Sequence, residues 1–214
     1  MRNNVTNNNP VFWKAIEAII IDIIIASISI ILILLGIKLI FGKQIKTAID
    51  YVNMISINKN SNIVKDLKFD ENTKTIISYP EYGTRYGNFK IDSLNIALPL
   101  YYGDEMSYLK YGIGQSSSAY FPGEGASIIC MGHNNKGILY DLPKIKKDAI
   151  IEINTTYGDF KYKVFKTKII NMNDIDEMEI QTDEEVLMVY TCYPVETLGE
   201  KKDRFVVYAK KIDN

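Results

Sequence analysis

The stretch "LMVYTCYPVETLGEKKDRFVVYA", from Leu187 to Ala209, contains two apolar runs separated by a polar segment. The first run ends at Cys192 and the second begins at Arg204. Proline and glycine in residues 193–203 mark the segment between them as a loop. The two runs therefore predict a pair of antiparallel strands, in which Cys192 lies across from Arg204 at the end of the hairpin.

The two faces of this hairpin follow from the alternation of side chains along a strand. On the first run, Met188 and Tyr190 share the face of Cys192. On the second run, Val206 and Tyr208 share the face of Arg204. The pattern predicts an apolar surface that leads to the cysteine and the arginine.

A third polar side chain also follows a strand directly. His133 is the only histidine in the chain and comes straight after the apolar run "ASIICMG", residues 126–132. A thiol becomes a useful nucleophile when a base or a cation favours its thiolate. A guanidinium offers fixed donors to a developing oxyanion. Cys192, His133 and Arg204 at three strand ends would therefore suffice for acyl transfer through a thioester.

Simpler interpretations of the same residues remain open at this point. A cysteine at a strand end is commonly a small buried side chain or, outside the cell, half of a disulfide. Cys130 is its one possible partner, but its position inside an apolar run favours a core thiol. A histidine in a Gly-His-Asn-Asn turn is commonly a surface residue, and Arg204 could simply cap the hairpin.

Two other kinds of cysteine site do not fit the spacing. One histidine and two distant cysteines do not form a zinc-binding pattern, so we predict no metal and no cofactor. A phosphatase loop needs an arginine six residues after its cysteine, and Leu198 occupies that position.

The rest of the C-terminal part has the sequence pattern of a mainly β fold. From about Gly87, short apolar runs alternate with turn residues. Roughly seven or eight strands favour a closed or nearly closed β-barrel with short helices over a layered α/β fold. The runs are 88–91, 94–102, 126–132, 150–170 (two strands joined at 157–159), 186–192 and 204–212, with helical turns near 104–111 and 138–142.

The N-terminal part contains one candidate membrane span. Residues from Ile19 to Phe41 are long and apolar enough to cross a bilayer as a helix, which needs roughly 20 residues. Asp22 would lie near one interface, and Lys38 could extend to the other. The run is long for a cleaved signal peptide and no small-residue cleavage site follows it, so we predict an uncleaved anchor preceded by interfacial Trp13.

These patterns divide the chain into four segments. We predict a disordered Asn-rich tail at 1–12, a transmembrane anchor at 13–41, a stalk or linker at 42–81 and a catalytic domain at 82–214. The formal net charge of −1 gives no basic surface for nucleic acid. Positive residues are slightly more numerous after the span than before it, so the lysine count alone does not place the C-terminal domain outside the cell.

Around these residues the sequence resembles the sortases, the cysteine transpeptidases of Gram-positive cell surfaces. The similarity covers about Asn88 to Ile212 and keeps the order His, then Thr-Cys, then Arg. The family's Thr-x-Thr-Cys signature reads "VYTC" here, with Val189 in the place of the first threonine. The stretches "TCYP…LG…RFVVYA", "LNIALPLYYG" and "YFPGEGASIICMGHN" are most similar to class D sortases.

The resemblance implies an eight-stranded sortase barrel outside the membrane, with Cys192 attacking the Thr–Gly carbonyl of a Leu-Pro-x-Thr-Gly-like sorting signal. Arg204 would hold the substrate and the oxyanion. His133 would protonate the leaving amine and then deprotonate the incoming one. Thr191 and Tyr193 would shape the substrate and oxyanion region. The implied partners are surface proteins with a sorting signal and a peptidoglycan precursor amine, with water as the alternative acceptor.

The sequence also departs from the family pattern. The family often carries a histidine near the position of Gln115, so the local substrate contacts are expected to differ there. No Asp-Pro-aromatic lid and no C-terminal span are seen, which disfavours a pilin-polymerising class C enzyme, and no acidic loop indicates a calcium site. The alternatives are a pilus-assembly sortase that uses a pilin lysine amine, or an anchored β-barrel binding module without enzyme activity.

Overall fold

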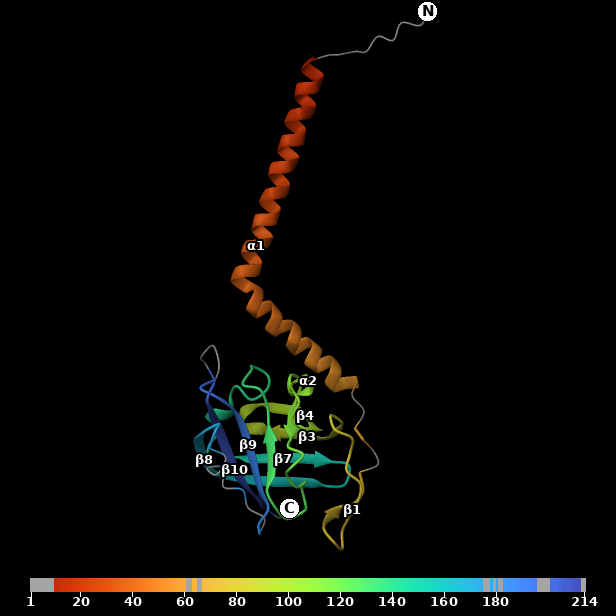
Figure 1. The fold of residues 1–214 in the computed structure, drawn as a ribbon, viewed down its shortest axis with the longest axis vertical. Coiled ribbons are helices and arrows are strands. Elements are labelled where there is room, and N and C mark those ends of the chain that lie inside the picture. The colour runs from red at the N-terminus through yellow and green to blue at the C-terminus, as the bar shows by residue number, and fades with distance from the viewer. Residues whose placement is uncertain are drawn as a thin grey trace, which may run out of the picture. The chain divides into compact units, whose positions relative to one another are not determined.

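The computed structural model describes residues 10–60, 63–64, 67–174, 178, 180, 183–195 and 201–212. The chain divides into two compact units, residues 1–49 and residues 50–214. The first unit is helical and the second contains the strands (Figure 1).

Helix α1 (Pro10–Asn60) carries the apolar span, and residues 10–42 are long and apolar enough to cross a membrane. Two serines within the span satisfy their hydroxyls inside the helix, because Ser27 and Ser29 each donate to the carbonyl four residues earlier at 2.8 Å. Residues 10–12, expected in the disordered tail, form the first helical turn, where a proline is well tolerated. The helix also continues past the expected end of the anchor at residue 41, so anchor and stalk share one helix.

Within the described residues, eight strands close into a barrel in the order β10-β8-β7-β3-β4-β5-β6-β9. β4–β5 and β6–β9 are parallel, and the other neighbours are antiparallel. This confirms the predicted mainly β fold. The strands are β3 (Arg85–Ile91), β4 (Ile96–Tyr102), β5 (Ile113–Gln115), β6 (Ile128–Met131), β7 (Ile150–Thr155), β8 (Asp159–Asn171), β9 (Val186–Tyr193) and β10 (Asp203–Ile212).

Within the ranges that the structure describes, three short helices with both ends defined connect strands of the barrel. They are η1 (Asp92–Leu94), α2 (Met106–Leu109) and η2 (Leu142–Lys144). α2 belongs to the crossover that makes β4 and β5 parallel. α2 lies within 104–111, where the sequence indicated a helical turn, whereas η2 only begins at 142, the last residue of the second indicated turn.

The barrel interior is filled by every second side chain of the strands, as expected for a small closed barrel. Large aromatic and aliphatic residues are fully buried there, which removes apolar surface from water and stabilises the fold. The main cluster includes Tyr86, Phe89, Leu100, Ile151 and Val207.

Strand β5 was not predicted, and its sequence "IGQ" explains why. Gly112 and Gly114 carry no side chain to show an alternating pattern. A Cβ atom at Gly112 would collide with the carbonyl oxygen of Pro99, and one at Gly114 with that of Gly103. Glycine therefore allows β5 to approach its neighbours closely. The same glycines remove the alternation of apolar and polar side chains by which a strand is recognised in a sequence.

The segment expected to be a stalk contains a small hairpin, β1 (Phe69–Asp70) and β2 (Thr75–Ile76). Leu67 and Ile76 are buried in the main core cluster, and the Ile76 N–H donates to Glu124 Oε1 at 2.8 Å. The end of the expected stalk is therefore packed on the barrel, because two apolar side chains in a polar segment are enough to attach it.

Candidate active site

Strands β9 and β10 place Cys192 directly opposite Arg204. The two residues are Cα partners in the antiparallel register, at the end of the hairpin. Both are half-buried, so each is held by the fold and still reaches solvent. The pairing predicted from the two apolar runs is confirmed.

The parallel pair β6–β9 places His133 beside the same strand end. Met131 pairs with Tyr190, and the Gly132 N–H continues the ladder by donating to the Tyr190 carbonyl at 3.3 Å. One residue further in this register, His133 comes level with Cys192. The three residues proposed for chemistry are therefore brought together from three strand ends.

His133 is half-buried, and its carbonyl accepts the Leu139 N–H at 3.0 Å, which fixes the backbone of the turn that follows β6. Burial lowers the pKa of His133 below its ordinary value, and the positive charge of Lys110 lowers it further. The neutral imidazole, which can accept a proton, is thus favoured near neutral pH.

The guanidinium of Arg204 is held by backbone carbonyls. Nη1 donates to the carbonyls of Lys201 and Asp203, both at 2.9 Å. Nη2 lies 3.9 Å from Sδ of Met172, which follows β8. Since a guanidinium stays protonated at any physiological pH, Arg204 carries a permanent positive charge on the strand that pairs with Cys192.

A second apolar cluster lies on the outer face of the hairpin and of β6, the face shared by Cys192 and Arg204. Its buried members are Leu109, Ile129, Met131, Ile170, Val186, Met188, Val206 and Tyr208, and Tyr190 and Met178 pack against it. Tyr190 donates its hydroxyl to Sδ of Met131 at 3.2 Å. Burial raises the pKa of Tyr190, although the charge of Arg204 opposes this shift. The apolar side chains predicted on the face of the cysteine are therefore present, and they are buried in this cluster.

Thr191 and Tyr193 lie on the opposite face of β9 from Cys192, as alternation requires. Thr191 is only 1% exposed, and its hydroxyl donates to the Gly132 carbonyl at 2.9 Å. The ring of Tyr193 packs against Phe205, with centroids 6.0 Å apart. In this arrangement Thr191 joins the ends of β6 and β9 next to His133, and neither side chain points to the thiol's face.

The two cysteines are both free, which excludes the disulfide. Cys130 is fully buried in the main core cluster, and burial raises the pKa of its thiol. The core interpretation of Cys130 is therefore confirmed.

Gln115, the position at which the sequence departs from the family, is also fully buried. Its side chain accepts the Tyr86 hydroxyl and donates to the Tyr120 carbonyl at 3.2 Å. Gln115 thus belongs to the polar part of the barrel interior.

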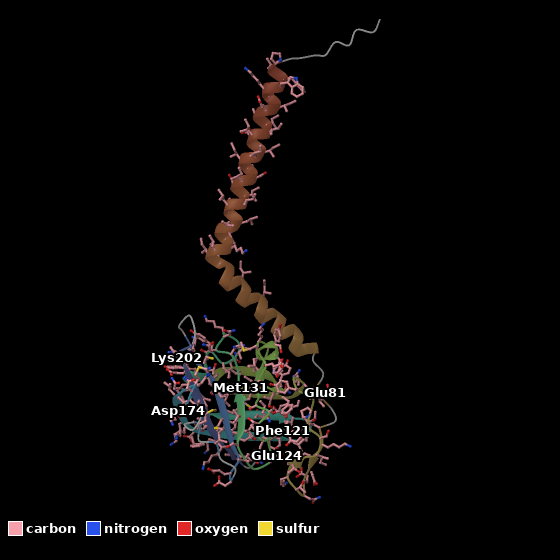
Figure 2. The ribbon with its side chains drawn as sticks, in the orientation of Figure 1. Glu81, Phe121, Glu124, Met131, Asp174 and Lys202 are labelled. Carbon is pink, nitrogen blue, oxygen red and sulfur yellow. The ribbon has the colours of Figure 1, made fainter. Side chains whose placement is uncertain are left out.

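A cleft of about 440 Å³ lies elsewhere on the barrel and is lined by residues that include Glu124 and Glu185. Glu185 directly precedes β9, so the cleft is separated from Cys192 by almost the whole strand, roughly 20 Å. In the view of Figure 2, Glu124 and Lys202 appear toward opposite edges of the barrel. In the described part of the chain, no three His, Cys, Asp or Glu side chains gather closely enough to hold a metal ion.

Sequence reasoning missed three residues that contact or influence the site: Lys110, Met172 and Lys201. Each lies in a connection between elements, where no periodicity indicates a direction. The one available signal was that the loop before Arg204 contains lysines, and lysines are common in surface loops of any protein.

Comparisons with known proteins agree with this geometry. The family model of the Sortase domain matches residues 89–212, more than half of the chain. Sortase D of Bacillus subtilis (strain 168) is 29% identical over 133 residues, which cover 62% of this chain and 67% of the relative.

Solved sortase structures share the fold. A Clostridium perfringens Sortase D5 transpeptidase has a TM-score of 0.56 at 22% identity, covering 63% of this chain and 83% of that chain. A C. perfringens sortase C with the C-terminal cell wall sorting motif has a TM-score of 0.56 at 25% identity, covering 83% of this chain and 100% of that chain. The chain belongs to the sortase family of cysteine transpeptidases, which the barrel, the relative and the family match show together.

Proposed function

We propose that this sortase cleaves a Leu-Pro-x-Thr-Gly-like sorting signal between Thr and Gly and transfers the acyl group to a peptidoglycan amine. The observation that carries the proposal is the cross-strand pair of Cys192 and Arg204, with His133 level with it on the neighbouring strand. A nucleophile, a proton carrier and a fixed cation are the groups that acyl transfer through a thioester requires.

The chemistry follows from these positions. The Cys192 thiol gives its proton to neutral His133 as its sulfur attacks the threonine carbonyl, and the developing oxyanion lies toward the charge of Arg204. His133 donates a proton to the glycine amine as the C–N bond breaks, leaving a thioester. The neutral His133 then takes a proton from the incoming amine as this attacks the thioester. It passes that proton to the Cys192 sulfur as the C–S bond breaks, and the thiol is regenerated.

The location of the reaction follows from α1. Its residues 10–42 fit a membrane anchor, and the family acts on proteins that carry sorting motifs. We place the barrel on the outer side of the membrane of a Gram-positive cell, because anchored substrates and lipid-linked amines lie there. The small excess of lysines after the span is a weaker argument than this chemistry.

A pilin lysine is the second candidate acceptor. It is favoured by the similarity to sortase C structures, one of which contains a sorting motif. Both candidates share the same acyl-enzyme, so they differ only in the amine that resolves it.

Intact mass spectrometry of the full chain in mild detergent tests the proposal. Incubation with Leu-Pro-x-Thr-Gly peptides should add the mass of the acyl fragment to the protein, and Cys192→Ala should remove the adduct. Adding a cell-wall-type amine or a lysine peptide then shows which acceptor discharges it. An adduct that persists in Cys192→Ala, or a folded protein with a reactive thiol and no adduct, would contradict the mechanism.

A further inference from the structure

We propose that Lys201 is a positioning residue for Arg204: it closes the loop between β9 and β10 and so holds the guanidinium that lies across from Cys192. This inference rests on the function proposed above. Lys201 lies three residues before Arg204 and is half-buried.

Lys201 contacts both sides of the loop. Its ammonium donates to the carbonyl of Pro194 at 2.5 Å and lies 3.5 Å from that of Val195, two and three residues after Cys192. Its own carbonyl accepts from Nη1 of Arg204 at 2.9 Å. A single residue therefore joins the chain that leaves Cys192 to the carbonyl that orients Arg204.

Strand β8 supports the returning side of the loop independently. The Met172 N–H donates to the Lys202 carbonyl at 2.7 Å, and the Asn171 side chain donates to Asp203 Oδ1 at 3.3 Å. The returning side is thus attached to the barrel, and the Lys201 ammonium attaches the departing side to it. Removing that ammonium would remove its bond to the Pro194 carbonyl and so weaken this attachment.

The orientation of Arg204 depends on this closure for a physical reason. A long arginine side chain has many rotamers, and ordering it is costly unless its N–H groups have fixed partners. Both fixed partners of Nη1 are carbonyls of the loop's returning side, at Lys201 and Asp203. If these carbonyls move, the guanidinium points less often at the oxyanion, and donors must be placed accurately to stabilise a transition state.

The test compares Lys201→Met with Lys202→Met in the full chain in mild detergent. Lys202 is the matched control, because it is the next residue, carries the same charge and is exposed. We expect Lys201→Met to lower the rate of acyl-enzyme formation at saturating peptide about tenfold and Lys202→Met to leave it within about twofold. The expected loss is smaller than the roughly 100-fold or greater cost of removing an oxyanion donor, because Arg204 remains and is only less well oriented. Lys201→Arg should restore most of the rate, since it can reach the same carbonyls.

Two readouts separate positioning from a general effect on the fold. The rate at which a small alkylating reagent modifies Cys192 should not change in Lys201→Met, because that reaction needs no oxyanion donor. In an Arg204→Lys background, Lys201→Met should have no further effect on acylation, because two residues that act through one group are not additive.

The inference is overturned if Lys201→Met matches Lys202→Met, or if its full effect persists in the Arg204→Lys background. It is also overturned if alkylation of Cys192 slows as much as acylation does. Absence of an adduct in the unsubstituted protein would instead reject the function proposed above, so the two failures are distinguishable.

Discussion

Cys130 and Cys192 lie on neighbouring parallel strands, and the same side chain has different surroundings in the two places. Cys130 pairs with Val189 inside the barrel and is fully buried, and burial raises the pKa of its thiol. Cys192, three residues further along β9, is half-buried across from the permanent charge of Arg204. Side-chain alternation turns one thiol inward and the other outward.

The difference shows that position decides how accessible a thiol is in this barrel. An apolar interior disfavours the thiolate of Cys130 and keeps reagents away from its sulfur, whereas Cys192 is half-buried at a strand end. The interior face has a role as well, because Thr191 on that face of β9 hydrogen-bonds the residue before His133. Inner residues therefore hold the strand ends on which the outer residues act.

The largest expected effect is in the alkylation of the two thiols. Iodoacetamide should modify Cys192 in the native protein at least about 1,000-fold faster than Cys130, because Cys130 reacts only when the barrel opens and open states are that rare in a stable domain. Mass spectrometry of Cys130→Ala and Cys192→Ala assigns each modification. In denaturant both thiols should react with iodoacetamide at similar rates. Similar alkylation rates in the native protein would contradict the expected difference between the two thiols.

A smaller effect is expected when the hydrogen bond of the Thr191 hydroxyl on the inner face of β9 is removed. Thr191→Val keeps the shape of the side chain but leaves the buried Gly132 carbonyl without its hydroxyl donor, which should lower the free energy of unfolding by about 1–3 kcal/mol. Urea unfolding in mild detergent, followed by circular dichroism, measures this loss.

The matched control for that substitution is Thr167→Val, at an exposed position of β8. It should change the free energy of unfolding by no more than about 0.5 kcal/mol. We also expect Thr191→Val to slow acylation, since it loosens the attachment of the turn that carries His133. Unchanged stability would mean that the hydroxyl contributes nothing to joining β6 and β9.

The smallest expected effect is on the protonation of His133. The charge of Lys110 disfavours the imidazolium, so Lys110→Met should raise the pKa of His133, and the limb of the pH–rate profile that it controls should move to higher pH. Because the chain has one histidine, its NMR signal can be followed without assignment.

Lys161→Met is the control for this shift. Lys161 pairs with Ile212, at the opposite end of β10 from Arg204, roughly 25 Å away and well beyond the screening length at physiological salt. It should leave the His133 pKa unchanged. A downward shift in Lys110→Met would show that Lys110 acts on His133 in another way than through its charge.

Much of this architecture could be predicted from the sequence because it depends on local patterns. The long uncharged run indicated α1, and alternating runs bounded by turn residues indicated most strands of the barrel. The pairing of Cys192 with Arg204 was predictable since a hairpin joins neighbouring segments, whose register follows from the loop between them. The order of His, Thr-Cys and Arg indicated the family that the comparisons show.

Tertiary structure decided what depends on contacts between distant segments. His133 and Cys192 meet through the parallel pairing of β6 with β9, which no local pattern specifies. The attachment of the β1–β2 hairpin, the existence of β5 and the contacts of Lys201 with Pro194 and Val195 were likewise invisible in the sequence. Periodicity reports which way a side chain faces along one element, whereas the partner it finds there depends on how the chain closes the barrel.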